Sequence, residues 1–181
     1  KHAIVTADGN TIGTATVVFA AADVSTSSTS EYVYIDADKY TTEWRDGDNV
    51  VVYNGIAADG STVEVTNTAP LTNDGIYGYN EDMTVITNAR VDVADTPNTF
   101  VDGKASPTAG TNDDYYAYAT GMELINNLLK VGNNYYNVTA DTQIIYVDDT
   151  LSTIDNSTGF VVLAEKDNAA STDVAVVYVT K

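Results

Sequence analysis

The sequence VVLAEKDNAASTDVAVVYV, residues 161–179, places a polar turn between two runs of valine. β-Branched residues are typical of strands, so this stretch predicts a β-hairpin. An earlier stretch, VVFAAADVSTSSTSEYVYI at residues 17–35, aligns with it without a gap at an offset of 144 residues, and seven of nineteen positions are identical. The two stretches therefore predict one hairpin used twice, as in a piece of a tandem array.

Most of the remaining chain shows the same pattern of short strands and turns. Runs rich in β-branched and aromatic residues occupy residues 14–20, 32–35, 49–56, 61–66, 84–87, 115–119, 134–138, 142–147, 159–164 and 174–179. Turn-forming pairs separate them, and Asp59-Gly60 predicts the clearest hairpin. Residues 121–131 also fit a helical stripe, but Asn126-Asn127 and Gly132-Asn133 favour strand, turn and strand.

These patterns predict an all-β fold made of two small antiparallel sandwich-like or barrel-like units. We expect an N-terminal unit at residues 1–97, in which residues 1–35 resemble the closing hairpin of a preceding module. A linker or long loop is expected at residues 98–113, because this region is rich in proline and small polar residues. The C-terminal unit is expected at residues 114–181.

The composition of the chain excludes several classes of function. Of the 181 residues, 26 are acidic and 8 are basic, and the formal net charge is -18. This charge argues against binding to nucleic acid or to an anionic membrane, since both need clustered Lys and Arg. The chain has no cysteine and one histidine, which excludes thiol chemistry, disulfides and a Cys/His zinc site. No apolar run is long enough for a membrane helix, and the Thr, Ser, Asn, Asp and Tyr richness favours an extracellular location.

The last third of the chain resembles the repeated β-modules that follow S-layer homology domains in secreted surface proteins of Gram-positive anaerobic bacteria. The similarity lies in residues 123–181, in a V-T-x-D-T-x-I phrase at residues 138–144 and a V-x-V-Y-V finish at residues 174–179. These motifs are structural. The resemblance implies a secreted, cell-wall-associated scaffold or adhesive repeat, with no family active site to carry over.

Paired carboxylates such as Asp148-Asp149 are frequent, but glycosidase chemistry needs two carboxyls that face each other across a sugar. We interpret these pairs as turn and surface residues, and we expect no enzymatic activity. Calcium is the better functional candidate, because it prefers several oxygen ligands on loops. Asp36, Asp38, Asp46 and Asp48 are the predicted metal ligands, and a hydrated acidic loop is the alternative.

Aromatic side chains suggest a second kind of site. Aromatic faces stack on sugar rings, and the candidates for a glycan-binding surface are Trp44, Tyr77, Tyr79, Tyr115, Tyr116 and Tyr118. Strand tyrosines also commonly cover a β core with the hydroxyl in water, which is the alternative. Lys130 is the one lysine whose neighbours suggest burial and a crosslink assisted by Glu123, but alternation favours a solvent-exposed side chain.

The expected function is therefore that of a non-enzymatic structural module of an S-layer-like cell-surface protein. Its expected partners are other copies or modules of the same protein, and cell-wall or host glycans. The alternative is an extracellular adhesin module that binds carbohydrate or a host protein and is stabilised by calcium. Neither nucleic-acid binding nor membrane insertion is expected.

Overall fold

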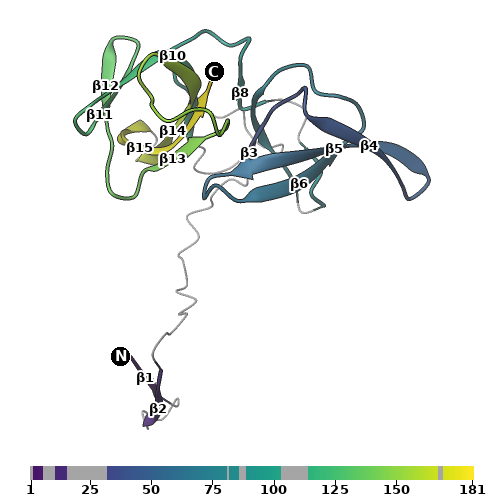
Figure 1. Cartoon of the computed structure of the whole chain (residues 1–181), viewed down its shortest axis with the longest axis horizontal. Helices are drawn as coiled ribbons and strands as arrows, with labels where there is room; N and C mark the ends of the chain where they lie inside the picture. The colour runs from purple at the N-terminus through teal and green to yellow at the C-terminus, as the bar shows by residue number, and fades with distance from the viewer. Residues whose placement is uncertain are drawn as a thin grey trace.

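The protein is an all-β chain, as the sequence predicts. The computed structural model describes residues 2–5, 11–15, 32–80, 82–85, 89–102, 114–166 and 169–181, and these contain strands and turns but no helix (Figure 1). Two short strands, β1 (His2–Val5) and β2 (Thr11–Ala15), pair antiparallel with each other. The other strands form two larger sheets.

The first sheet is entirely antiparallel. Its order is β4-β5-β3-β7-β8, and β6 pairs with the other edge of β5. The strands are β3 (Tyr32–Ile35), β4 (Tyr40–Arg45), β5 (Asp48–Ala57), β6 (Thr62–Asn67), β7 (Gly75–Gly78) and β8 (Val91–Asp92). The predicted hairpin at Asp59-Gly60 joins β5 to β6, and Gly60 takes the positive φ of 82° that a glycine accepts without strain.

The second sheet closes into a small barrel. Its strands are β9 (Val101–Asp102), β10 (Tyr115–Ile125), β11 (Leu128–Val131), β12 (Asn134–Asn137), β13 (Gln143–Tyr146), β14 (Ser157–Lys166) and β15 (Ala169–Thr180). The order β11-β12-β15-β14-β10 returns to β11, because β10 also pairs with β11. The pairs β12–β15 and β13–β15 are parallel, and the others are antiparallel. The ring is completed between β12 and β15 by one residue pair, Asn137 with Asp173.

Strand β10 makes this closure possible by bending at Gly121. Strand β10 pairs with β14 as far as Met122, and from Glu123 onward it pairs with β11. The register shifts between Thr120 and Met122, and Gly121 has a φ of 61°. The prediction of strand, turn and strand over residues 121–131 is confirmed, with Asn126 in the turn at a φ of 57°.

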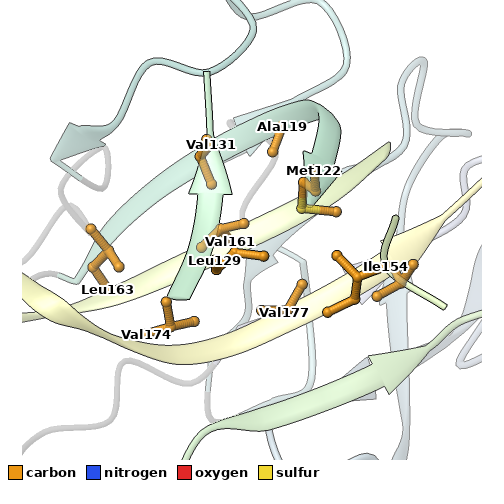
Figure 2. Close-up of a cluster of buried hydrophobic side chains, with 10 residues drawn as sticks. Ala119, Met122, Leu129, Val131, Ile154, Val161, Leu163, Val174 and Val177 are labelled. Atoms are coloured by element: carbon orange, nitrogen blue, oxygen red, sulfur yellow. The ribbon is translucent and has the colours of Figure 1, made fainter. Parts of the chain in front are cut away.

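The barrel interior is filled by apolar side chains from β10, β11, β14 and β15 and by Ile154 from the segment before β14 (Figure 2). Its buried members are Ala119, Met122, Leu129, Val131, Ile154, Val161, Leu163, Val174, Val177 and Val179. Figure 2 shows Leu129 and Val131 on β11 facing Val161 and Val177 across the interior. The barrel is therefore a packed core and not a channel.

Alternate residues of three strands contribute to a second core between the two sheets. On β3, Tyr32 and Tyr34 face the barrel, whereas Val33 and Ile35 face the core of their own sheet. Strands β14 and β15 alternate in the same way between the barrel interior and the junction. Because successive strand residues point to opposite sides, these three strands have no solvent-facing side over their central residues. The two sheets thus share a continuous apolar junction.

The hairpin predicted at residues 161–179 is present, whereas its predicted counterpart at residues 17–35 is described only in part. Residues 161–179 form the expected hairpin from β14 and β15, with Val161 opposite Val177. Val33, which aligns with Val177, lies inside the first sheet between Ala57 and Tyr77. Residues 16–31 lie outside the described residues, so the tandem repeat stays a prediction. Residues 98–102 of the predicted linker lie against the barrel, where the Asn98 N–H donates to the Tyr118 carbonyl at 2.7 Å.

Candidate functional site at the junction of the sheets

Aromatic rings from both sheets meet at the junction. The Tyr32 and Tyr116 rings lie edge to face with centroids 5.5 Å apart, and the Tyr34 and Tyr178 rings stack at 5.7 Å. The ring centroids of Phe160 and Tyr34 lie 5.6 Å apart. Pairs of this geometry contribute about 0.5–1.5 kcal/mol beyond the area that they bury. We call Tyr32, Tyr34, Tyr116, Phe160 and Tyr178 the junction cluster.

A buried arginine completes the junction. Arg90 is 5% exposed, and its guanidinium lies 5.4 Å from the Tyr116 ring centroid and 5.9 Å from that of Tyr32. Its Nη1 donates a hydrogen bond to the Tyr116 hydroxyl at 3.0 Å. A cation over two aromatic faces is attracted by their negative centres, and this attraction strengthens away from water. Arg90 immediately precedes β8 of the first sheet. Its contacts with Tyr116 therefore connect the first sheet to β10 of the barrel.

Next to the cluster, a cleft of about 220 Å³ opens between the sheets. Tyr34, Tyr118 and Phe160 form its apolar part. Its polar part comes from the turns that follow β3 and β13, the residue before β7, the start of β14 and the end of β15. The residues are Asp36, Lys39, Asp74, Asp148, Thr158, Thr180 and Lys181. The cleft is thus built from segments far apart in the sequence.

Each carboxylate of the cleft has a partner. Lys39 Nζ lies 3.0 Å from Asp36 Oδ2, and Lys181 Nζ lies 2.6 Å from Asp148 Oδ2. Asp74 Oδ1 accepts a hydrogen bond from the Ala37 N–H at 2.8 Å. The Lys181 ammonium, together with the hydrogen bonds from Thr150, holds the pKa of Asp148 well below its usual range. Asp36 and Asp148 are thus paired with lysines, whereas Asp74 is held by a backbone hydrogen bond.

Burial raises the pKa of the tyrosines beside the cleft, whereas the pKa of Asp148 is lowered. Desolvation, together with the charges of Asp74 and Asp36, raises the pKa of Tyr34 far above its ordinary value. Desolvation also raises the pKa of Tyr178, with smaller contributions from Tyr116 and Asp59. Both phenols stay protonated at physiological pH. A cleft with an apolar aromatic wall and hydroxyls offers contacts that suit a neutral, hydroxyl-rich ligand.

The predicted calcium ligands lie at two ends of β4. Asp36 and Asp38 belong to the turn before it, and Asp46 and Asp48 lie at the turn after it. Asp36 Oδ1 accepts from the Asp38 N–H at 3.2 Å and Asp36 Oδ2 binds Lys39, so Asp36 is already engaged. No group of three acidic or histidine side chains with metal-site geometry occurs within the described ranges. The structure does not bring the four predicted ligands together in one copy of the chain.

The predicted aromatic surface is also dispersed. Tyr77 and Tyr116 are 3% and 0% exposed, and the Tyr77 hydroxyl donates to the Asn73 carbonyl at 2.7 Å. Tyr79, Tyr115 and Tyr118 are half-buried. Trp44, by contrast, is 70% exposed on β4. Of the six predicted residues, only Tyr118 lines the cleft.

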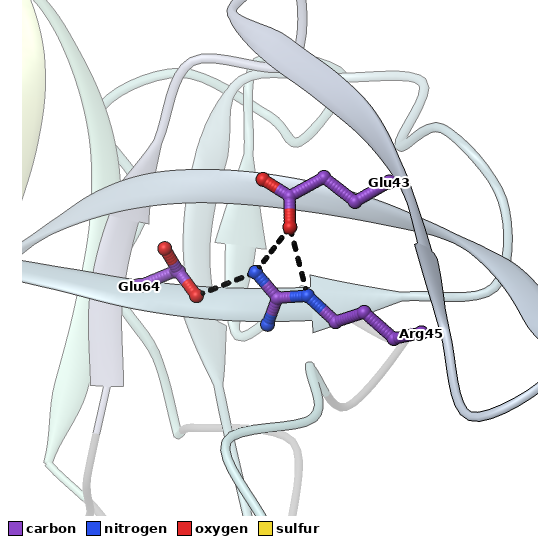
Figure 3. Close-up of polar contacts among 3 residues, drawn as sticks. All are labelled: Glu43, Arg45 and Glu64. Atoms are coloured by element: carbon purple, nitrogen blue, oxygen red, sulfur yellow. Dashed lines mark hydrogen bonds and ion pairs between the residues drawn. The ribbon is translucent and has the colours of Figure 1, made fainter.

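Three ion pairs lie on the surface away from the cleft, and Arg45 makes two of them. Arg45 Nε and Nη2 donate to Glu43 Oε2 at 2.9 and 2.6 Å, and Nη2 also donates to Glu64 Oε1 at 2.9 Å (Figure 3). Lys130 Nζ lies 3.1 Å from Glu123 Oε2, directly across from it on the neighbouring strand. The Lys130 side chain is 30% exposed, in line with the interpretation that its ammonium reaches solvent.

Sequence reasoning missed Lys39, Asp74, Arg90 and Lys181 as parts of the junction. Lys39 and Asp74 lie 35 residues apart and meet only because β3 and β7 are neighbours. The one local signal was Arg90, a charged residue between Ala89 and Val91. No periodicity or motif marks a cleft whose walls come from two sheets.

Comparison with models of protein families, with curated proteins and with solved structures finds no match to this chain. None of the elements in the described ranges is a helix that could cross a membrane.

Proposed function

We propose that this chain is a non-enzymatic structural module of a bacterial cell-surface protein of the S-layer type. The observation that carries the proposal is the junction cluster, which joins the two sheets through buried aromatic rings and Arg90. Interfaces between mobile domains are usually more polar. An apolar junction instead makes the two sheets one rigid body, which suits a part whose task is to keep its shape.

The charge of the chain fits the same role. A net charge of -18 keeps neighbouring molecules soluble and extended, with a repulsion that is screened beyond about 8 Å at physiological salt. Local pairing of the cleft carboxylates also favours a structural role, since a general acid needs a raised pKa and the pKa of Asp148 is lowered. The location at the cell wall rests on the resemblance of residues 123–181 to S-layer-associated modules.

Protease shaving of intact cells that produce the full-length protein tests the location. We expect peptides from these 181 residues to be released without lysis. A cytoplasmic protein of the same cells serves as the control and stays intact. Full protection of the chain until the cells are lysed would rule out a surface module.

The second candidate function is that of a glycan-binding adhesin module. The cleft favours it, because Tyr34, Tyr118 and Phe160 offer apolar faces beside the hydroxyls of Thr158 and Thr180. Screening on a glycan array tests it with the wild-type chain and with Tyr118→Ala. Binding that is lost in Tyr118→Ala supports the adhesin role, whereas the absence of any bound glycan removes it.

The adhesin candidate includes stabilisation of the folded chain by bound calcium. Thermal melting in sodium chloride and in calcium chloride at equal ionic strength separates a bound ion from general screening. A higher Tm in calcium alone supports a specific site. Equal Tm values would show that calcium acts only as a screening ion.

A further inference from the structure

Strand β4 has an open edge. It is the terminal strand of the first sheet, and no described strand pairs with its outer side. Tyr40, Thr41, Thr42, Glu43 and Trp44 are all exposed, so both faces of the strand are open as well. Figure 1 shows the β4–β5 hairpin extending away from the barrel at the far end of the molecule. Such an edge presents unpaired N–H and C=O groups to any strand that approaches it.

The features that usually protect an edge are missing from β4. Its pairing with β5 is regular over six residue pairs, from Tyr40 opposite Tyr53 to Arg45 opposite Asp48, so no bulge twists the edge away. No proline or lysine lies within the strand, and the one arginine is engaged with Glu43 and Glu64. The edge is therefore competent for strand addition.

Hairpin geometry indicates which main-chain groups point outward. The turn consists of Asp46 and Gly47, whose φ values are 51° and 96°, so Arg45 and Asp48 form the hydrogen-bonded pair that closes it. Because such pairs alternate along an antiparallel ladder, Tyr40, Thr42 and Trp44 direct their N–H and C=O groups to the open side. These three residues also project their side chains to one face.

The sequence of β4 is nearly symmetric about Thr42. An aromatic residue lies two positions away on each side, Tyr40 and Trp44, and they are 43% and 70% exposed. We propose that β4 pairs antiparallel with β4 of a second copy of this chain, with Thr42 on the two-fold axis. Tyr40 then faces Trp44 of the second copy, Thr42 faces its equivalent, and Thr41 faces Glu43. Aromatic and Thr–Thr cross-strand pairs are among those that stabilise sheets.

Charge opposes this pairing at low ionic strength. The same register places Lys39 of one copy opposite Arg45 of the other, and the turn with Asp36 and Asp38 opposite the turn with Asp46 and Asp48. Salt screens this repulsion, so we expect the association to strengthen as ionic strength rises. The isologous contact closes on itself and gives a dimer.

Trp44 reports directly on the contact because it is the only tryptophan of the chain. The test measures sedimentation velocity and tryptophan emission of the full chain over a wide range of protein concentration, at low and at physiological salt. We expect a monomer–dimer equilibrium and an emission that shifts to the blue as the dimer forms.

Two lysine substitutions at adjacent exposed positions form a matched pair. Thr42→Lys places two lysines opposite each other on the axis, so we expect the dimer to weaken about tenfold or more. Thr41→Lys adds the same charge but places it opposite Glu43 of the second copy, so the dimer should persist. At protein concentrations where the wild type is monomeric, both variants should melt at the wild-type temperature, since neither side chain is buried.

Several results would overturn the proposal. One is a wild-type monomer whose Trp44 emission does not change with concentration, as expected if another segment of the same chain covers the edge. Others are a Thr42→Lys dimer as tight as wild type, or equal losses in the two variants. The proposal concerns the β4 edge alone, so it goes beyond the surface-module role and is tested independently of where the protein is located.

Discussion

Gly159 on β14 lies close against the backbone of β15. A Cβ at this position would lie 2.0 Å from the Tyr178 carbonyl oxygen and 3.0 Å from the Met122 methyl group. We expect Gly159→Ala to lower the free energy of unfolding by about 2 kcal/mol or more, because the backbone of β15 must move. Gly121→Ala is the control, since its Cβ meets nothing within 4 Å and its cost of about 1 kcal/mol comes from the positive φ. Urea unfolding measures both, and equal costs would contradict the steric explanation.

Tyr77 makes the free energy of unfolding depend on pH in the alkaline range. Burial, followed by the charge of Asp92, raises its pKa to about 12. Because the folded pKa lies above the unfolded value of about 10, its contribution is complete below pH 10 and is lost as pH rises through 12. Tyr77→Phe loses the hydrogen bond to Asn73, at about 1 kcal/mol near pH 8, but should lose less additional stability above pH 10.

Urea midpoints between pH 8 and pH 11 test this expectation, with absorbance at 295 nm recording ionisation of the tyrosines. Tyr135→Phe is the control because Tyr135 is 54% exposed. If Tyr77→Phe and wild type lose stability in parallel above pH 10, ionisation of Tyr77 does not drive the loss.

At the scale of the element, the β10–β11 hairpin depends on one turn residue. Asn126 has a φ of 57°, a conformation that asparagine and glycine accept more readily than other residues. We expect Asn126→Ala to destabilise the protein by about 1 kcal/mol and Asn126→Gly to be close to neutral. Thermal melting of the two variants is the measurement. A Gly variant as unstable as the Ala variant would show that the Asn side chain, and not its φ, is what matters.

The strands also differ in how well local sequence predicts them. The pattern at residues 159–164 and 174–179 predicts β14 and β15 because both are long and valine-rich. Strand β4 was not predicted, since YTTEWR has no buried face to create an alternation. Strand β7 was missed because Gly75 and Gly78 enclose only two large residues; Gly75 is required where Val91 and Asp92 of β8 approach closely.

At the scale of the whole molecule, the junction cluster predicts cooperative unfolding. Tyr34 belongs to the first sheet, but its ring contacts Phe160 and Tyr178 of the barrel. We expect Tyr34→Ala to cost about 3 kcal/mol or more and to destabilise both sheets together. Hydrogen exchange should then become faster in β14 and β15 as well as in β3 and β5.

Val65→Ala is a second test of the same prediction. Val65 is buried in the core of the first sheet, away from the junction. If the sheets unfold together, its cost of about 2 kcal/mol should speed exchange in β14 and β15 as well as in β5 and β6. If Tyr34→Ala left the barrel strands as protected as they are in wild type, the two sheets would be separate folding units.

The sequence by itself determined that the chain is all-β, where the turns at Asp59-Gly60 and Asn126-Asn127 lie, and that β14 and β15 form a hairpin. These features follow from local propensity and period-two alternation, which act within a few residues. Tertiary structure alone decided that β10 bends to close a barrel, that both sides of β3 are buried, and that Asp36, Asp74 and Asp148 meet around one cleft. Such contacts join residues far apart in the chain, and their partners are set by how two sheets bury their remaining apolar faces against each other.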